Sequence, residues 1–160
     1  MSFLGLSTTN NLSFYAIPAA WVLAIAPHFY AMALYNKERA PGTPAWSFAS
    51  PKSNIVNIKS AKLSPSVEDA FLRAEAANDN SFVGLPLFAA AIVAGNVARL
   101  PVDTLNAAAA LYLVSRIAYS VLYVKGTNLL GGLSRTTAWL TASFTCLTLF
   151  VKAGNKLYGF

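Results

Sequence analysis

The chain has 160 residues, of which 56% are hydrophobic and only 11% are charged, against roughly 25% charge in an ordinary soluble domain. Its net charge of +6 is not gathered on a soluble face with interleaved aromatics, which excludes a nucleic-acid-binding role. One histidine and one cysteine offer no metal-ligand cluster. The long charge-free runs instead predict an all-α membrane protein, a single domain over residues 1–160 that spans the bilayer with four helices.

The first predicted span covers residues 12–35. The first 36 residues carry no charge, so there is no basic region of the kind that precedes the apolar core of a signal peptide. We therefore expect this segment to stay in the mature protein as a membrane helix. His28 lies inside it, and because no second His, Cys or carboxylate stands at metal spacing, we interpret it as a hydrogen-bonded packing residue.

Residues 36–66 are rich in Pro, Gly, Ser and Lys, and predict a long polar loop in which four prolines, Pro41, Pro44, Pro51 and Pro65, break any regular element. By the positive-inside tendency this loop is expected in the cytosol. Four crossings then place seven basic residues on the cytosolic side and three opposite, with both termini away from the cytosol. The seven are Lys37, Arg39, Lys52, Lys59, Lys62, Lys125 and Arg135, and the three are Arg99, Lys152 and Lys156.

The second predicted span, residues 67–100, starts as a charged helix and becomes apolar without a turn signal. Helical spacing puts Arg73, Ala77, Asn80 and Gly84 on one face, where a polar ligand could be held. Further along, small residues permit close helix approach between subunits. These are Ala89, Ala90, Ala91, Ala94 and Gly95.

The third predicted span, residues 104–124, has Arg116 near its middle, where a guanidinium costs at least ~2.5–3.5 kcal/mol unless it meets a polar cavity or a carboxylate. Tyr112, Tyr119 and Tyr123 lie on the same face of this helix as Arg116. This set predicts either a binding site or a packing face of aromatic rings in which the arginine extends toward the membrane surface. The fourth span, residues 136–151, has Arg135 at its cytosolic start, and we assign its Cys146 to packing.

Three segments, RAEAANDNSFVGLPLF, LYLVSRIAYSVLYV and LSRTTAW, together resemble the MAPEG family, the membrane-associated proteins in eicosanoid and glutathione metabolism. The resemblance covers about residues 10 to 152. It implies a homotrimer of four-helix bundles with a glutathione site between subunits, open toward the cytosol. The expected location is the endoplasmic reticulum membrane.

The family pattern of the second helix is matched by Arg73, Ala77, Asn80 and Pro86, but two positions depart from it. Asn78 stands where the family has His, and Val83 stands where it has Glu. Arg116 matches the buried arginine of the third helix. The resemblance further identifies Arg135 with the arginine thought to stabilise the glutathione thiolate.

The implied chemistry has Arg135 lowering the thiol pKa of glutathione, with Tyr119 and Tyr123 beside a lipophilic electrophile that enters from the bilayer. The glutathione peptide would be held by Arg73, Asn80 and Arg116, and its terminal carboxylate by Lys37 or Arg39.

Asp79 precedes Val83 by one turn on the same face. We hypothesise that it supplies the missing carboxylate, either to Arg116 or to the amine of the ligand.

Two other functions stay open. The Val83 departure favours a glutathione-independent isomerase or cyclase that acts on a hydrophobic, secondary-metabolite-like substrate through Arg and Tyr groups. The other is a non-enzymatic lipid-binding scaffold, against which the retention of Arg135 and Asn80 argues. No motif specifies the substrate, because a lipid-facing cleft is defined by its shape.

Overall fold

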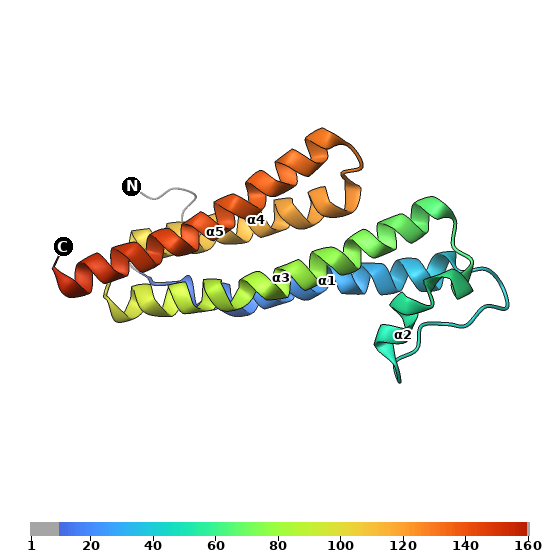
Figure 1. Cartoon of the computed structure of the whole chain (residues 1–160). Coiled ribbons are helices and arrows are strands. Elements are labelled where there is room, and N and C mark those ends of the chain that lie inside the picture. Colours follow the sequence, from blue (N-terminus) through green and yellow to red (C-terminus); the bar gives the residue numbers. More distant parts are fainter. Residues whose placement is uncertain (1–9, 160) are drawn as a thin grey trace.

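Four long antiparallel helices form the described part of the chain, residues 10–159 of a computed structural model (Figure 1). In chain order the elements are η2 (Ser13–Tyr15), α1 (Ala16–Glu38), α2 (Pro51–Val56), η3 (Ile58–Ala61), α3 (Pro65–Val97), α4 (Val102–Lys125) and α5 (Leu129–Tyr158). Helix α1 packs mainly on α3, and α4 packs mainly on α5. The two pairs lie close together near the α3–α4 turn and diverge toward the end that carries α2 (Figure 1).

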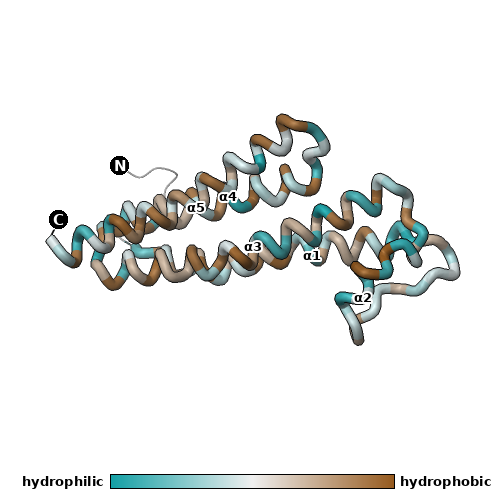
Figure 2. Tube along the Cα trace, viewed as in Figure 1, coloured by the Kyte–Doolittle hydropathy of each residue, from teal (hydrophilic) through white to brown (hydrophobic). Residues whose placement is uncertain are grey.

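Three helical segments are long and apolar enough to cross a membrane: Ser13–Glu38, Pro65–Val97 and Val102–Lys125. They agree with the first three predicted spans and confirm an all-α membrane protein. Helix α5 begins and ends well outside the predicted limits of 136 and 151, and hydrophilic residues recur along it (Figure 2). Arg135 therefore lies within a helix and not in a loop, and the crossing by α5 stays a prediction.

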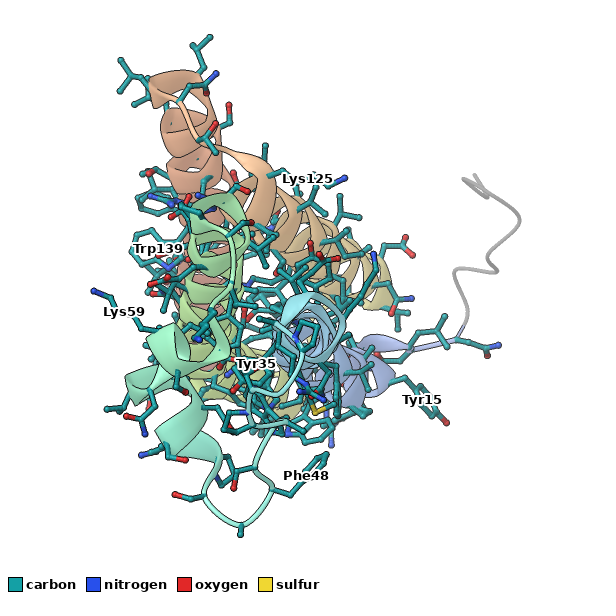
Figure 3. The ribbon with its side chains drawn as sticks, turned by 90° about the vertical axis from the view of Figure 1, so that its right-hand side faces the viewer. Tyr15, Tyr35, Phe48, Lys59, Lys125 and Trp139 are labelled. Atoms are coloured by element: carbon teal, nitrogen blue, oxygen red, sulfur yellow. The ribbon has the colours of Figure 1, made fainter. Side chains whose placement is uncertain are left out.

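The connection between α1 and α3 is folded, so the prediction that its prolines break every regular element is wrong. Pro51 and Pro65 each begin a helix, because the first helical position needs no N–H partner and the fixed φ of proline suits it. Trp46 of this connection is buried, with its ring centroid 5.6 Å from that of Tyr35 and 6.2 Å from that of Phe71. Figure 3 shows Tyr35 amid these side chains, whereas Phe48 points outward. The connection is thereby anchored on the α1–α3 pair.

Two of the five small residues of α3 pack inside the chain, and the expected role of this set between subunits stays a prediction. Ala91 and Gly95 are buried. A Cβ at Gly95 would lie 2.7 Å from a methyl carbon of Leu105, so this glycine lets α4 approach α3 closely. Ala90 alone among the five small residues is exposed.

A tight turn joins α4 to α5. The Asn128 side chain accepts a hydrogen bond from the Gly131 backbone N–H at 2.8 Å and caps α5. A Cβ at Gly131 would lie 2.9 Å from the Cα of Gly126, which is closer than a real Cβ approaches another carbon. Glycine at this position therefore lets the start of α5, one turn before Arg135, lie against the end of α4.

We expect Gly131→Ala to destabilise the protein by about 1–3 kcal/mol, because the added methyl group overpacks a backbone contact. Thermal unfolding in detergent, followed by circular dichroism, measures the effect. Gly132→Ala is the matched control, since a Cβ there meets nothing within 4 Å and alanine is favoured over glycine in a helix by about 1 kcal/mol. Equal unfolding midpoints for the two variants would contradict the proposed close approach.

Candidate functional site

The guanidinium of Arg116 is buried in the middle of α4, with 5% of the residue exposed. Its Nη2 donates a hydrogen bond of 2.7 Å to the Ser81 hydroxyl, which in turn donates to the Ala77 carbonyl at 2.7 Å. Its Cζ lies 4.2 Å from the centroid of the Tyr119 ring. No carboxylate lies within ion-pair distance of it among residues 10–159. A hydroxyl and an aromatic face therefore stabilise this charge.

Arg135 makes the same kind of contact at the surface. Its Cζ lies 4.2 Å from the centroid of the Tyr123 ring, and this ring meets the Tyr119 ring edge to face at 5.4 Å between centroids. Arg116, Tyr119, Tyr123 and Arg135 thus form a continuous stack, here called the arginine–tyrosine ladder. The ladder connects the interior of α4 with the first turns of α5.

A polar hollow of about 230 Å³ opens at the outer end of this ladder. Helix α3 contributes Asn80, α4 contributes Tyr119 and Tyr123, and α5 contributes Arg135, Thr136 and Trp139. We call it the Arg135 hollow. Figure 3 places Trp139 on the outside of the bundle, on the side away from Lys125. The hollow combines a cation, hydroxyl groups and an amide, which suits a small polar ligand.

Four predicted site residues therefore come together here: Asn80, Tyr119, Tyr123 and Arg135. Arg116 reaches them through the Tyr119 ring. Sequence reasoning missed Thr136 and Trp139 as lining residues. The signal for Trp139 was its spacing of four residues from Arg135, which places both on one face of a helix.

Five of the six predicted ligand-binding residues do not line the hollow: Arg116, Asp79, Arg73, Lys37 and Arg39. The last three have partners of their own. Arg73 forms an ion pair with Asp69, and its Nε donates to the Val124 carbonyl at 3.0 Å, so it links α3 to α4. Lys37 is exposed and pairs with Glu38 at 3.2 Å. Arg39 donates to the Thr43 carbonyl within the α1–α3 connection. Their roles toward a ligand stay predictions, since in this chain each has a partner of its own.

The face shared by Arg73, Ala77, Asn80 and Gly84 packs mainly inside the chain, and its expected role in holding a polar ligand stays a prediction. Ala77 is fully buried, and a Cβ at Gly84 would lie 3.6 Å from the Tyr112 hydroxyl. Only Asn80, at the edge of this face, is exposed.

The expected pair between Asp79 and Arg116 is not formed. Asp79 is exposed, and Ser81 bonds to Arg116 in its place. Two residues along a helix correspond to about 200° of rotation, so these side chains leave α3 in opposite directions. Val83 lies one turn after Asp79 on the same face of α3, and 80% of its surface is exposed. This face of α3 points away from the rest of the chain.

His28 pairs with Glu75, a partner that sequence reasoning did not find. Its Nδ1 lies 2.9 and 3.1 Å from the two carboxylate oxygens, and Glu75 is buried. The Trp46 ring meets the imidazole edge to face at 5.5 Å between centroids. The pair links α1 to α3 and neither member lines the Arg135 hollow, which agrees with a hydrogen-bonded packing role.

Comparison with protein families gives one match: the MAPEG family model covers residues 14–155. No curated protein and no solved structure matches the chain. Within residues 10–159 there is no group of three or more His, Cys, Asp or Glu side chains that could hold a metal ion.

Replacing Ser81 by Ala should leave a buried guanidinium N–H unpaired and destabilise the protein by roughly 1–3 kcal/mol. The midpoint of thermal unfolding in detergent measures this loss. Ser120→Ala is the control, because Ser120 stands on the same helix as Arg116 and makes no side-chain hydrogen bond within residues 10–159. An S81A variant as stable as S120A would show that the ladder does not need this hydroxyl.

Proposed function

The chain belongs to the MAPEG family, and on this premise we propose that it is a membrane-embedded transferase that conjugates or isomerises a lipophilic electrophile with glutathione. The observation that supports the proposal is the Arg135 hollow, where a guanidinium stands beside Tyr123 and Asn80. A cation and an amide at the surface of an otherwise apolar bundle suit a peptide ligand that carries carboxylates and a thiol.

Arg135 carries the proposed chemistry. A cysteine thiol has a pKa of about 8.5 in water, and a guanidinium within hydrogen-bond reach lowers that pKa by stabilising the thiolate. The Tyr123 ring covers one face of the guanidinium, which leaves the N–H groups at its edge to bond the sulfur. The thiolate sulfur then forms a bond to the electrophilic carbon. The displaced electron pair goes to the leaving group, or to an oxygen that the Tyr123 hydroxyl protonates.

A homotrimer would complete the site. Exposed apolar side chains recur on one face of α3 at steps of four, three, three and four: Val83, Leu87, Ala90, Val93 and Val97. The small Ala90 at the centre of this stripe permits close helix approach in a membrane, and copies joined there would place Asp79 beside a neighbour. Lys37, Arg39 and Arg73 would then act on a ligand across a subunit boundary.

The proposed orientation puts the α2 end of the bundle in the cytosol and both termini on the other side, in the endoplasmic reticulum membrane. The seven basic residues expected in the cytosol and Arg73, which bonds to Val124, lie toward the α2 end, against three toward the opposite end, in keeping with the positive-inside tendency. The Arg135 hollow would then open where cytosolic glutathione can reach it, while the electrophile enters from the bilayer.

A second candidate is a glutathione-independent isomerase or cyclase in the same hollow. The observation that favours it is Val83, which puts an exposed apolar side chain where the family has a carboxylate. In that case Arg135 and Tyr123 would polarise or protonate the hydrophobic substrate directly. A lipid-binding scaffold is the remaining alternative.

Arg135→Ala should remove the thiolate absorbance that appears when glutathione binds, and should leave much of the binding affinity. The expected loss in rate is about 30-fold to 1,000-fold, because a charge-assisted hydrogen bond to the reacting sulfur is worth roughly 2–4 kcal/mol. Ultraviolet difference spectra and turnover of a model electrophile in detergent measure both effects. Lys125→Ala, which removes a cation outside the hollow, is the control and should change neither.

Val83→Glu separates the two candidates. Under the glutathione proposal the restored carboxylate tightens glutathione binding, whereas under the isomerase proposal it only impairs activity. Conversion of the substrate at full rate without glutathione would refute the transferase proposal.

A further inference from the structure

A second, larger groove runs along the outside of the α4–α5 pair, separate from the Arg135 hollow, with a volume of about 770 Å³. Its α5 wall carries a row of threonines, Thr137, Thr141, Thr145 and Thr148. The hydroxyls of the first three donate to the carbonyl four residues earlier, at 2.7–3.0 Å. Their donors are therefore used within the helix, and the threonine groove offers a ligand mainly methyl groups and the Leu111 and Phe144 side chains.

A hollow of about 600 Å³ continues the threonine groove at the α3–α4 turn. Thr104 and Lys152 line both, Lys156 lines the hollow and Asp103 lines the groove. All three charged residues are exposed, and none forms an ion pair within residues 10–159. An apolar channel thus leads to two cations and one anion that do not pair with other residues of the described chain.

The groove is longer than one leaflet of a bilayer. From Thr137 to Lys152 it follows α5 for fifteen residues, or about 22 Å at ~1.5 Å per residue, whereas one leaflet of a hydrocarbon core of ~30 Å is about 15 Å thick. A lipid whose headgroup lies at the charged hollow would therefore fill the part of the groove nearest Lys152, and the groove extends beyond it.

We infer that this groove is a binding site for a glycerophospholipid with a primary ammonium headgroup, of the phosphatidylethanolamine type. Lys152 and Lys156 bind the phosphate, Asp103 binds the ammonium, and one acyl chain lies along the threonine row. This arrangement gives each of the three free charges a partner. It does not depend on the reaction at the Arg135 hollow.

A second copy of the chain fits the threonine groove less well than a lipid does, because of the charges that it would bring. Copies of the chain inserted in one membrane share their orientation, so the α3–α4 turn of one copy would lie beside the α3–α4 turn of its neighbour. The only acidic residue near this end is Asp103, since the other five lie at Glu38, Glu68, Asp69, Glu75 and Asp79. A neighbouring copy would add further net positive charge at this end, from Arg99, Lys152 and Lys156 against one Asp103, whereas a zwitterionic phospholipid adds none.

Native mass spectrometry of the full chain in mild detergent tests the inference, with added phosphatidylethanolamine, phosphatidylcholine and phosphatidylglycerol of matched acyl chains. We expect adducts of phosphatidylethanolamine to exceed the other two. Asp103→Asn should lower that preference roughly tenfold, the effect of losing one charge-assisted hydrogen bond. Lys152→Ala with Lys156→Ala should weaken all three lipids, and Lys125→Ala, at the other end of α4, should change none.

Thr148→Trp should block the groove and abolish the selective adducts, whereas Leu147→Trp, an exposed position outside the groove, should keep them. Circular dichroism checks that both variants fold. Equal retention of the three lipids in the native chain, unchanged by Asp103→Asn, would overturn the inference. Loss of the oligomer in Thr148→Trp alone would also overturn it, because the groove would then hold another copy.

Discussion

The buried charge of Arg116 is the constraint on which the rest of the structure depends. A guanidinium in the middle of a membrane helix is tolerated only where polar or aromatic groups surround it. Ser81 provides the hydroxyl and Tyr119 the ring, which fixes the register of α3 against α4. Because Tyr119 contacts Tyr123, and Tyr123 contacts Arg135, the same constraint reaches α5. The surface arginine of the candidate site is thus positioned by the interior one.

The site built in this way is one-sided. Its inner wall, formed by the arginine–tyrosine ladder, is complete within one chain. On the outer side, Asp79 and Val83 of α3 are exposed, and no element among residues 10–159 covers them. The exposed apolar stripe of α3 lies on that same side, so in the proposed homotrimer association along the stripe would also complete the site.

Helix α5 serves two different surfaces with neighbouring residues. Thr136 lines the Arg135 hollow, and Thr137 lines the threonine groove. The helix therefore carries polar residues on more than one face, which is why its composition is less apolar than that of the three clear spans. The hydroxyl groups of Thr136, Thr137, Thr141 and Thr145 donate to carbonyl groups of the same helix, so these threonines remain compatible with a bilayer.

The sequence by itself determined the class of protein, the positions of three long apolar helices and the family, because apolar runs and short motifs are local properties of a chain. It also brought Asn80, Tyr119, Tyr123 and Arg135 into one site through helical spacing and family resemblance. Only the tertiary structure decided that Ser81 and not Asp79 meets Arg116, that Glu75 binds His28, that Trp139 lines the hollow and that Arg73 is held by Val124 and Asp69. Periodicity shows which residues share a face of a helix, but which face is buried, and against which partner, depends on how the helices pack.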